Sequence, residues 1–227
     1  MSDKKLVILI SGNGSNLQAI IDSVTESYIQ ADIAAVISNR GDAYGLIRAQ
    51  LNDIPTHTIE HTQYTKRTEF DKALQICIDQ YQPDLLILAG FLRILSADFV
   101  QHYHAKILNI HPSLLPKYPG LNTHQQALDA GDTSHGTTVH FVTPELDSGP
   151  LVIQASQEIT SAHRASNEPA LQLASEILEQ EHIIYPLAIK WFIEDRLKLS
   201  QNGAELDGEL LRVPKQLQTI QSEDKPH

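Results

Sequence analysis

Short continuous apolar runs alternate with segments of helical spacing through the first half of the chain. Runs of β-branched and leucine residues predict strands covered on both faces, at residues 5–10, 33–37, 55–59, 85–88 and 107–110. The segments between them predict helices over 17–24, 42–52, 65–81 and 97–103. This alternation is typical of an α/β fold with a doubly wound, mostly parallel sheet and helices on both faces.

The pattern changes after residue 110. A helix is predicted over 123–131, followed by two extended runs at 135–142 and 151–159. The connection between these two runs is short, and neighbouring strands joined in this way are usually antiparallel. We therefore expect a mixed sheet with an antiparallel C-terminal portion.

The C-terminal third predicts a long helix from about residue 168, with Pro169 in its first turn. Proline lacks a backbone N–H, so we expect a break near Pro186 before the helix resumes over 187–199. Asp207-Gly208 predicts a hairpin turn within 203–213, and the polar tail QLQTIQSEDKPH after it is expected to fray. We thus expect one domain over 1–200, then a hairpin and a polar tail over 201–227.

Composition narrows the class of protein. The 227-residue chain has a net charge of −11 and no block of five basic residues, which argues against nucleic acid or an anionic membrane as a partner. Small-molecule substrates are expected instead, with the oligomeric state left open. Cys77 is the only cysteine and is expected in the core, so no disulfide can form within the chain, as is typical of proteins in a reducing compartment. The sequence shows neither an apolar run of membrane-spanning length nor a signal peptide. We therefore expect a cytoplasmic protein. We expect solvated charges at Lys66, Lys106 and Lys117.

The segment SGNGSN, Ser11 to Asn16, lies between the first strand and the first helix. This arrangement directs free backbone N–H groups toward an anion. Leu17 stands where a dinucleotide fingerprint needs its third glycine, and a P-loop lysine is missing, so a phosphate monoester fits better than either. A purely structural turn is the alternative.

Asn109 and His111 lie two residues apart at the end of a predicted strand, so their side chains share one face. Pro112 favours extended backbone at His111 and ends the ladder there. Ligands of parallel α/β sheets bind at the carboxyl ends of strands. An amide can donate to a developing oxyanion while an imidazole handles a proton. Alternatively, His111 caps the strand and Asn109 satisfies a turn.

Two carboxylates extend this hypothesis. Asp147 precedes Ser-Gly-Pro, and the simplest interpretation is an Asx turn. If its loop instead folds over the strand end, the carboxylate would favour a charged His111 that donates near neutral pH. Glu181 lies on the apolar stripe of the long helix, where a charge needs a cationic partner. That partner could be a substrate amine or a basic side chain of the protein.

A metal site is not expected. His102 and His104 are two residues apart near a helix end and would point in different directions. The sequence also contains neither an HExxH motif nor a cysteine cluster.

Four segments, SGNGSN, LAGFLRILS, NIHPSLLPKYPG and HGTTVHFVTPELDSGP, together resemble the formyltransferase family that uses 10-formyltetrahydrofolate. The resemblance extends over residues 5 to about 200 and is densest in these segments. It implies a Rossmann-like formyltransferase fold, and within the family the neighbouring segments look like those of the branch that acts on glycinamide ribonucleotide. The implied reaction moves the formyl group of 10-formyltetrahydrofolate to the amine of 5'-phosphoribosylglycinamide, a step of purine (IMP) biosynthesis.

The resemblance also implies roles for individual residues. It makes Asn109, His111 and Asp147 the catalytic set, and Glu181 the group that holds the substrate amine. The implied glycinamide ribonucleotide site comprises Gly14, Ser15, Asn16, Leu178, Glu179, Gln180 and Glu181. The implied folate site comprises Arg67, Leu92, Arg93, Ile94, Leu95, Asn109, Thr143, Pro144, Glu145, Leu146 and Asp147. Residues 159–167 are longer than the family pattern suggests, so the register of the Glu181 segment is the less secure.

Three other functions share parts of this pattern. A formyltetrahydrofolate deformylase would use the same catalytic set with water in place of the amine, but usually carries a regulatory domain before it, for which we expect no room. A methionyl-tRNA formyltransferase adds a basic C-terminal domain, which we do not expect in this acidic chain. A non-catalytic folate or nucleotide sensor would be expected to have lost Asn109, His111 or Asp147.

Overall fold

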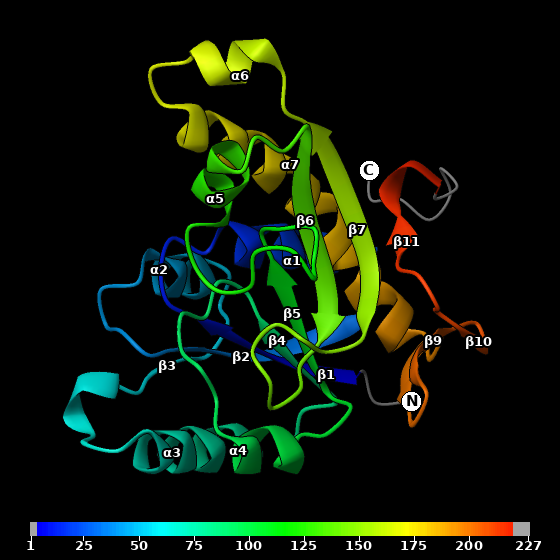
Figure 1. Cartoon of the computed structure of the whole chain (residues 1–227). Coiled ribbons are helices and arrows are strands. Elements are labelled where there is room, and N and C mark those ends of the chain that lie inside the picture. Colours follow the sequence, from blue (N-terminus) through cyan, green and yellow to red (C-terminus); the bar gives the residue numbers. More distant parts are fainter. Residues whose placement is uncertain (1–3, 220–227) are drawn as a thin grey trace. The chain divides into compact units, whose positions relative to one another are not determined.

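The structure, a computed structural model, describes residues 4–219 and contains one mixed, mostly parallel sheet with helices (Figure 1). Its strand order is β11-β7-β6-β5-β4-β1-β2-β3, and a separate small sheet has the order β10-β9-β8. The chain divides into two compact units, residues 1–109 with 142–144 and residues 110–141 with 145–227. Each unit is described by itself below.

The first unit contains the strand and helix alternation that the apolar runs predict. Its strands pair in parallel, with β1 between β2 and β4. The elements are β1 (Lys4–Ile10), α1 (Ser15–Thr25), β2 (Ala31–Ser38), α2 (Tyr44–Leu51), β3 (Thr56–Thr58), η1 (His61–Gln63), α3 (Arg67–Asp79), β4 (Leu85–Leu88), α4 (Ala97–His102) and the first part of β5 (Ile107–His111).

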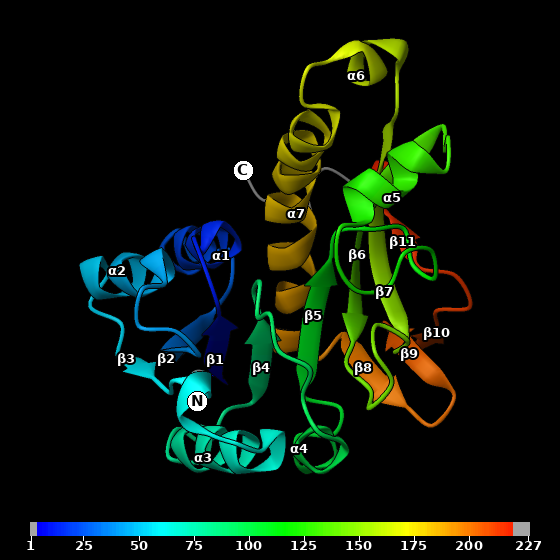
Figure 2. The ribbon, with the colours of Figure 1, turned by 60° about the vertical axis from the view of Figure 1, so that its left-hand side comes forward.

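Alternate residues of the central strand face two different helix layers. Val7 and Leu9 belong to a buried cluster with Phe70 of α3 and Phe99 of α4. Ile10 faces the other way, toward α2. Figure 2 shows α1 and α2 on one face of these strands and α3 and α4 on the other. The prediction of a doubly wound sheet is therefore confirmed.

The second unit contains the antiparallel portion. Strand β6 pairs antiparallel with β7, as the short connection predicts. The long helix α7 packs against β7 and β6 (Figure 1). The elements are α5 (Thr123–Asp129), β6 (Ser134–Phe141), β7 (Leu151–Glu158), α6 (Ser161–Ala165), α7 (Pro169–Ile193), β8 (Leu197–Ser200), β9 (Gly203–Leu206), β10 (Glu209–Leu210), β11 (Lys215–Gln216) and η2 (Leu217–Thr219).

The predicted break at Pro186 is wrong, because α7 continues through it. An interior proline costs a helix about 3 kcal/mol. Its neighbours Tyr185, Leu187 and Ala188 are fully buried, and burying one leucine side chain contributes about 1.5–3 kcal/mol. Packing of this stretch therefore offsets the missing hydrogen bond.

The predicted continuation of the helix to Leu199 is also wrong. Asp195 has φ 60°, its N–H donates to the Phe192 carbonyl, and the Arg196 N–H donates to the Trp191 carbonyl. This is a Schellman motif, in which the residue after the cap is usually glycine. Because aspartate takes that place here, the stop signal was hidden, and Leu197 instead begins β8.

The predicted hairpin is present. The prediction that the tail frays is wrong for residues 216–219, which form part of β11 and the short helix η2. Asp207 and Gly208 both have positive φ, 54° and 84°, as a type I′ turn between β9 and β10 requires. Lys215 and Gln216 pair in parallel with β7, which supplies hydrogen bonds that the sequence pattern does not reveal. The remainder of the tail, 220–227, lies outside the described residues.

The segment 159–167, longer than the family pattern suggests, contains the short helix α6. Thr160 and His163 form a capping box at its start. The His163 Nε2 atom lies 2.9 Å from Glu176 Oε2 of α7. The extra residues therefore form an ordered turn attached to α7.

Candidate active site

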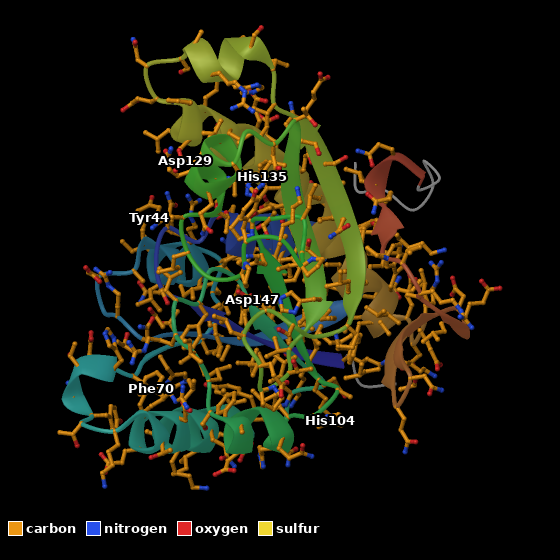
Figure 3. The ribbon with its side chains drawn as sticks, in the orientation of Figure 1. Tyr44, Phe70, His104, Asp129, His135 and Asp147 are labelled. Atoms are coloured by element: carbon orange, nitrogen blue, oxygen red, sulfur yellow. The ribbon has the colours of Figure 1, made fainter. Side chains whose placement is uncertain are left out.

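His111 and Asp147 face each other in the second unit. The His111 Nδ1 atom lies 3.4 Å from Asp147 Oδ2, and both side chains are almost fully buried. Asp147 has φ 47°, in the left-handed region that aspartate tolerates better than most residues. Figure 3 shows Asp147 in the connection between β6 and β7. The loop thus brings its carboxylate to the imidazole, as the catalytic hypothesis requires and an isolated Asx turn does not.

The two nitrogens of His111 have different surroundings. Nε2 lies 2.8 Å from the Tyr118 carbonyl oxygen. A carbonyl only accepts, so Nε2 carries a proton. The 3.4 Å separation at Nδ1 exceeds the ordinary hydrogen-bond range of about 2.7–3.2 Å. The Nδ1 edge is therefore the part of the ring that a substrate oxygen can engage, beside the Asp147 carboxylate.

Asp147 has two further polar neighbours, a backbone N–H that donates to it and a second histidine. Its Oδ2 accepts a 2.9 Å hydrogen bond from the Gly120 N–H. Its Oδ1 lies 3.8 Å from Nε2 of His140, a fully buried residue of β6. Burial lowers the pKa of His140, and its Nδ1 lies 2.9 Å from the Phe141 carbonyl. The Gly120 N–H thus orients the carboxylate before any substrate arrives.

Asn109 lies two residues before His111 in β5 and is half-buried. Strand alternation places the two side chains on the same face. The amide and the imidazole therefore leave the strand end in the same direction, as the spacing predicts.

The sequence did not indicate a pair of neighbouring histidines, His124 of α5 and His135 of β6. His135 Nε2 lies 3.2 Å from His124 Nδ1, and the rings meet edge to face. Figure 3 labels His135 at the α5 end of β6. Burial, followed by the nearby His124, lowers the pKa of His135 to about 4. The motif HGTTVHF contained two histidines as a signal, but their burial was not evident from it.

This depressed pKa predicts acid sensitivity. In the unfolded chain a histidine binds a proton with a pKa of about 6.5, whereas folded His135 does so only at about 4. Its contribution to stability is therefore complete above pH 6.5 and is lost as the pH falls from 6.5 toward 4. We expect the urea midpoint to fall between pH 7 and pH 5, and to fall less in His135→Gln. An equal fall of the urea midpoint in the wild-type protein and in His135→Gln would contradict the lowered pKa of His135.

Glu181 lies on the buried face of α7, with an exposed fraction of 7%. Ile177 and Ile184, one turn away on either side, are fully buried. The predicted position on an apolar stripe is therefore confirmed. Gln180 donates 3.0 Å to Gln157 of β7, which attaches this part of the helix to the sheet.

The loop from Ser11 to Asn16 lies in the first unit. Gly14 has φ 76°, and a Cβ there would approach the Gly45 Cα to 2.7 Å, so this position needs glycine. As the N-cap residue of α1, Gly14 has no side chain with which to cap the helix. The first N–H groups of the helix are thus oriented for an anion.

Arg48 of α2 contacts this loop, which the sequence did not indicate. Its Nε donates 3.0 Å to the Asn13 carbonyl and its Nη2 donates 2.9 Å to Asn13 Oδ1. Ser11 is fixed as well, because its hydroxyl donates 2.6 Å to Asn39 Oδ1 and accepts from the Leu92 N–H. The loop therefore has a fixed shape and one basic side chain attached to it.

The residues expected at a folate site fall in two places. In the first unit, the loop after β4 exposes Leu92 and Ile94, 66% and 53%, while Leu95 is buried. Arg67 at the start of α3 and Arg93 are exposed. Exposed apolar side chains beside arginines suit an aromatic ring with carboxylates. The other place is the loop 143–147, where Glu145 and Leu146 are exposed.

Within residues 4–219, no cluster of three or more histidine, cysteine, aspartate or glutamate side chains could hold a metal ion. His102 instead lies 3.0 Å from Asp79.

Among the helices of residues 4–219, none has both the length and the apolar character that a membrane span needs. Lys66, Lys106 and Lys117 are exposed, as expected, although Lys117 is also paired with Asp132.

The chain belongs to the formyl transferase family, whose pattern matches residues 4–189. Over 211 residues it is 51% identical to the phosphoribosylglycinamide formyltransferase of Escherichia coli, covering 93% of this chain and 96% of that protein. A solved structure of the phosphoribosylglycinamide formyltransferase from Coxiella burnetii is 50% identical with a TM-score of 0.85, covering 92% and 95%. A formyltetrahydrofolate deformylase from Pseudomonas syringae is 25% identical with a TM-score of 0.77, covering 90% and 66%. The family and fold predictions are confirmed.

Proposed function

We propose that this protein is a phosphoribosylglycinamide formyltransferase. It moves the formyl group of 10-formyltetrahydrofolate to the amine of 5'-phosphoribosylglycinamide and releases formylglycinamide ribonucleotide and tetrahydrofolate. The observation that carries this proposal is the contact between His111 and Asp147, in a chain 51% identical to an enzyme of that name. We expect the protein in the cytoplasm, where this reaction is a step of purine synthesis.

The chemistry follows from the orientation of these side chains. The substrate amine attacks the formyl carbon, and the formyl oxygen becomes an oxyanion. Asn109 and the Nδ1–H of a His111 ring that is protonated on both nitrogens donate to that oxyanion, and one such donor contributes roughly 2.7–4 kcal/mol in other enzymes. Asp147 accepts the proton that the amine loses. The bond from the formyl carbon to the folate nitrogen then breaks, and that nitrogen takes up a proton.

The remaining residues bind the two substrates. The N–H groups at Gly14, Ser15 and Asn16 bind the ribonucleotide phosphate, and Glu181 holds the amine with the help of its neighbours Leu178, Glu179 and Gln180. This assignment is supported by the position of Gly14 as the N-cap of α1 and by the burial of Glu181. For the folate, Leu92, Ile94 and Leu95 contact the pteridine, and Arg67 and Arg93 contact its polar groups. The loop Thr143–Pro144–Glu145–Leu146–Asp147 and Asn109 complete that site.

Release of tetrahydrofolate from 10-formyltetrahydrofolate tests the proposal. We expect release only when 5'-phosphoribosylglycinamide is present, together with one formylated ribonucleotide for each tetrahydrofolate. Release that does not need the amine would indicate a deformylase, and no release at all would indicate a binding protein. Either result would overturn the proposed transfer.

A further inference from the structure

One short segment of the second unit contacts both members of the His111–Asp147 pair. The Tyr118 carbonyl accepts from His111 Nε2 at 2.8 Å. Two residues later, the Gly120 N–H donates to Asp147 Oδ2 at 2.9 Å. The backbone of residues 118–120 therefore sets both the rotation of the imidazole and the position of the carboxylate beside it.

This backbone has an unusual conformation. Tyr118 has φ 55° and Gly120 has φ 84°. Glycine adopts positive φ freely, but an aromatic residue rarely does. The left-handed conformation at Tyr118 must therefore be maintained by its surroundings.

The side chains of Lys117 and Tyr118 both contact Asp132, in the turn after α5. The Tyr118 hydroxyl donates 2.9 Å to Asp132 Oδ2, and Lys117 Nζ donates 3.0 and 2.9 Å to its two oxygens. The Asp132 carbonyl accepts at 2.6 Å from Arg164. The Asp132 side chain is only 17% exposed, whereas that of Lys117 is 60% exposed. A single anchored carboxylate thus ties down two consecutive side chains of the segment.

We propose that Asp132 is a positioning residue for the reaction, acting through Lys117 and Tyr118. We call these three residues the Asp132 clamp. The clamp holds the 118–120 backbone in the conformation that presents the Tyr118 carbonyl to His111 and the Gly120 N–H to Asp147. It does not touch the reacting atoms. The kinetic part of this proposal rests on the proposed function, and the structural part does not.

The charge of the clamp is consistent with this role. The hydrogen bonds from Lys117 and Tyr118, in that order, lower the pKa of Asp132. The carboxylate is therefore ionised at neutral pH and accepts both donors together. Asparagine at this position would keep the shape but could not accept from both through two charged oxygens.

The test compares Asp132→Asn and Tyr118→Phe with a matched control, Asp207→Asn. Asp207 also accepts two hydrogen bonds from a basic side chain, Arg196, at 2.8 and 3.0 Å, but it lies at the β9–β10 turn. The first readout is the ring N–H resonance of His111 in the protein without substrates, assigned by its loss in His111→Gln. We expect this resonance to shift or broaden in both clamp variants and to stay unchanged in Asp207→Asn.

The second readout is steady-state kinetics, well below the melting temperature of every variant. We expect kcat to fall about tenfold in Asp132→Asn, with each KM within about twofold of wild type, because the catalytic pair is misplaced while the substrate contacts remain. Lys117→Arg, which keeps the charge, should retain more activity than Lys117→Met. Control Asp207→Asn should match wild type.

Two results would overturn the clamp. One is an unchanged His111 resonance in Asp132→Asn and Tyr118→Phe. The other is a loss of kcat that appears equally in Asp207→Asn, which would indicate a general loss of stability. If the wild-type protein transfers no formyl group, the proposed function fails, but the resonance still decides the clamp. If Asp132→Asn does not fold, the His111 resonance and kcat are both measured in Tyr118→Phe instead.

Discussion

His111→Ala is expected to lower kcat about 10²–10⁴-fold, the range typical of a group that assists proton movement or charge development. In the folded protein the ring is fixed by the Tyr118 carbonyl and faces Asp147. Alanine removes the oxyanion donor and leaves the carboxylate without its partner. The measurement is kcat for tetrahydrofolate release at saturating concentrations of both substrates.

His163→Ala is the matched control for this change. His163 is also a buried histidine of the second unit, 4% exposed against 5% for His111, and it also lies close to a carboxylate, Glu176. Both variants should lose comparable stability to urea, and only His111→Ala should lose most of its turnover. A His111→Ala enzyme with kcat within about threefold of wild type would remove His111 from the mechanism.

Asp147→Asn is expected to lower kcat by about 10²-fold or more, because the amide cannot take up the proton that the amine loses. The substitution preserves size and an oxygen that can accept from the Gly120 N–H. The loop conformation, including the positive φ at this position, should therefore persist, since asparagine also tolerates it. The same release assay measures the loss.

Ser148→Ala provides the neighbouring control. The Ser148 hydroxyl donates 2.9 Å to the Leu146 carbonyl in the same loop, and it is exposed. We expect wild-type kcat in Ser148→Ala and a large loss in Asp147→Asn. Equal losses would mean that the loop conformation, and not the carboxylate, determines activity.

The sequence predicted the layered fold correctly because its signals are local. The apolar runs at 5–10 and 85–88 and the helical spacing between them do not depend on distant residues. Asp207-Gly208 also fixes its turn locally, because both residues adopt positive φ. The errors at Pro186 and at 197–199 have the opposite origin. There, burial of α7 and a Schellman motif with aspartate in place of glycine overrode the local pattern.

For the site, the sequence by itself determined which residue types were present and where strands end. It placed Asn109 and His111 on one face because a strand repeats every two residues. It could not decide between an Asx turn at Asp147 and a contact with His111, since both fit the same local residues. Only the tertiary structure decided this, by bringing a loop after β6 to the end of β5.

The groups that orient the site were likewise decided by tertiary structure alone. Arg48 reaches Asn13, and Asp132 reaches Tyr118, across separations that no periodicity in the sequence encodes. Such contacts depend on how helices and turns pack, and packing is set by the sum of many buried side chains. The sequence therefore determined the chemistry available to this protein, and the fold decided which groups meet and in what orientation.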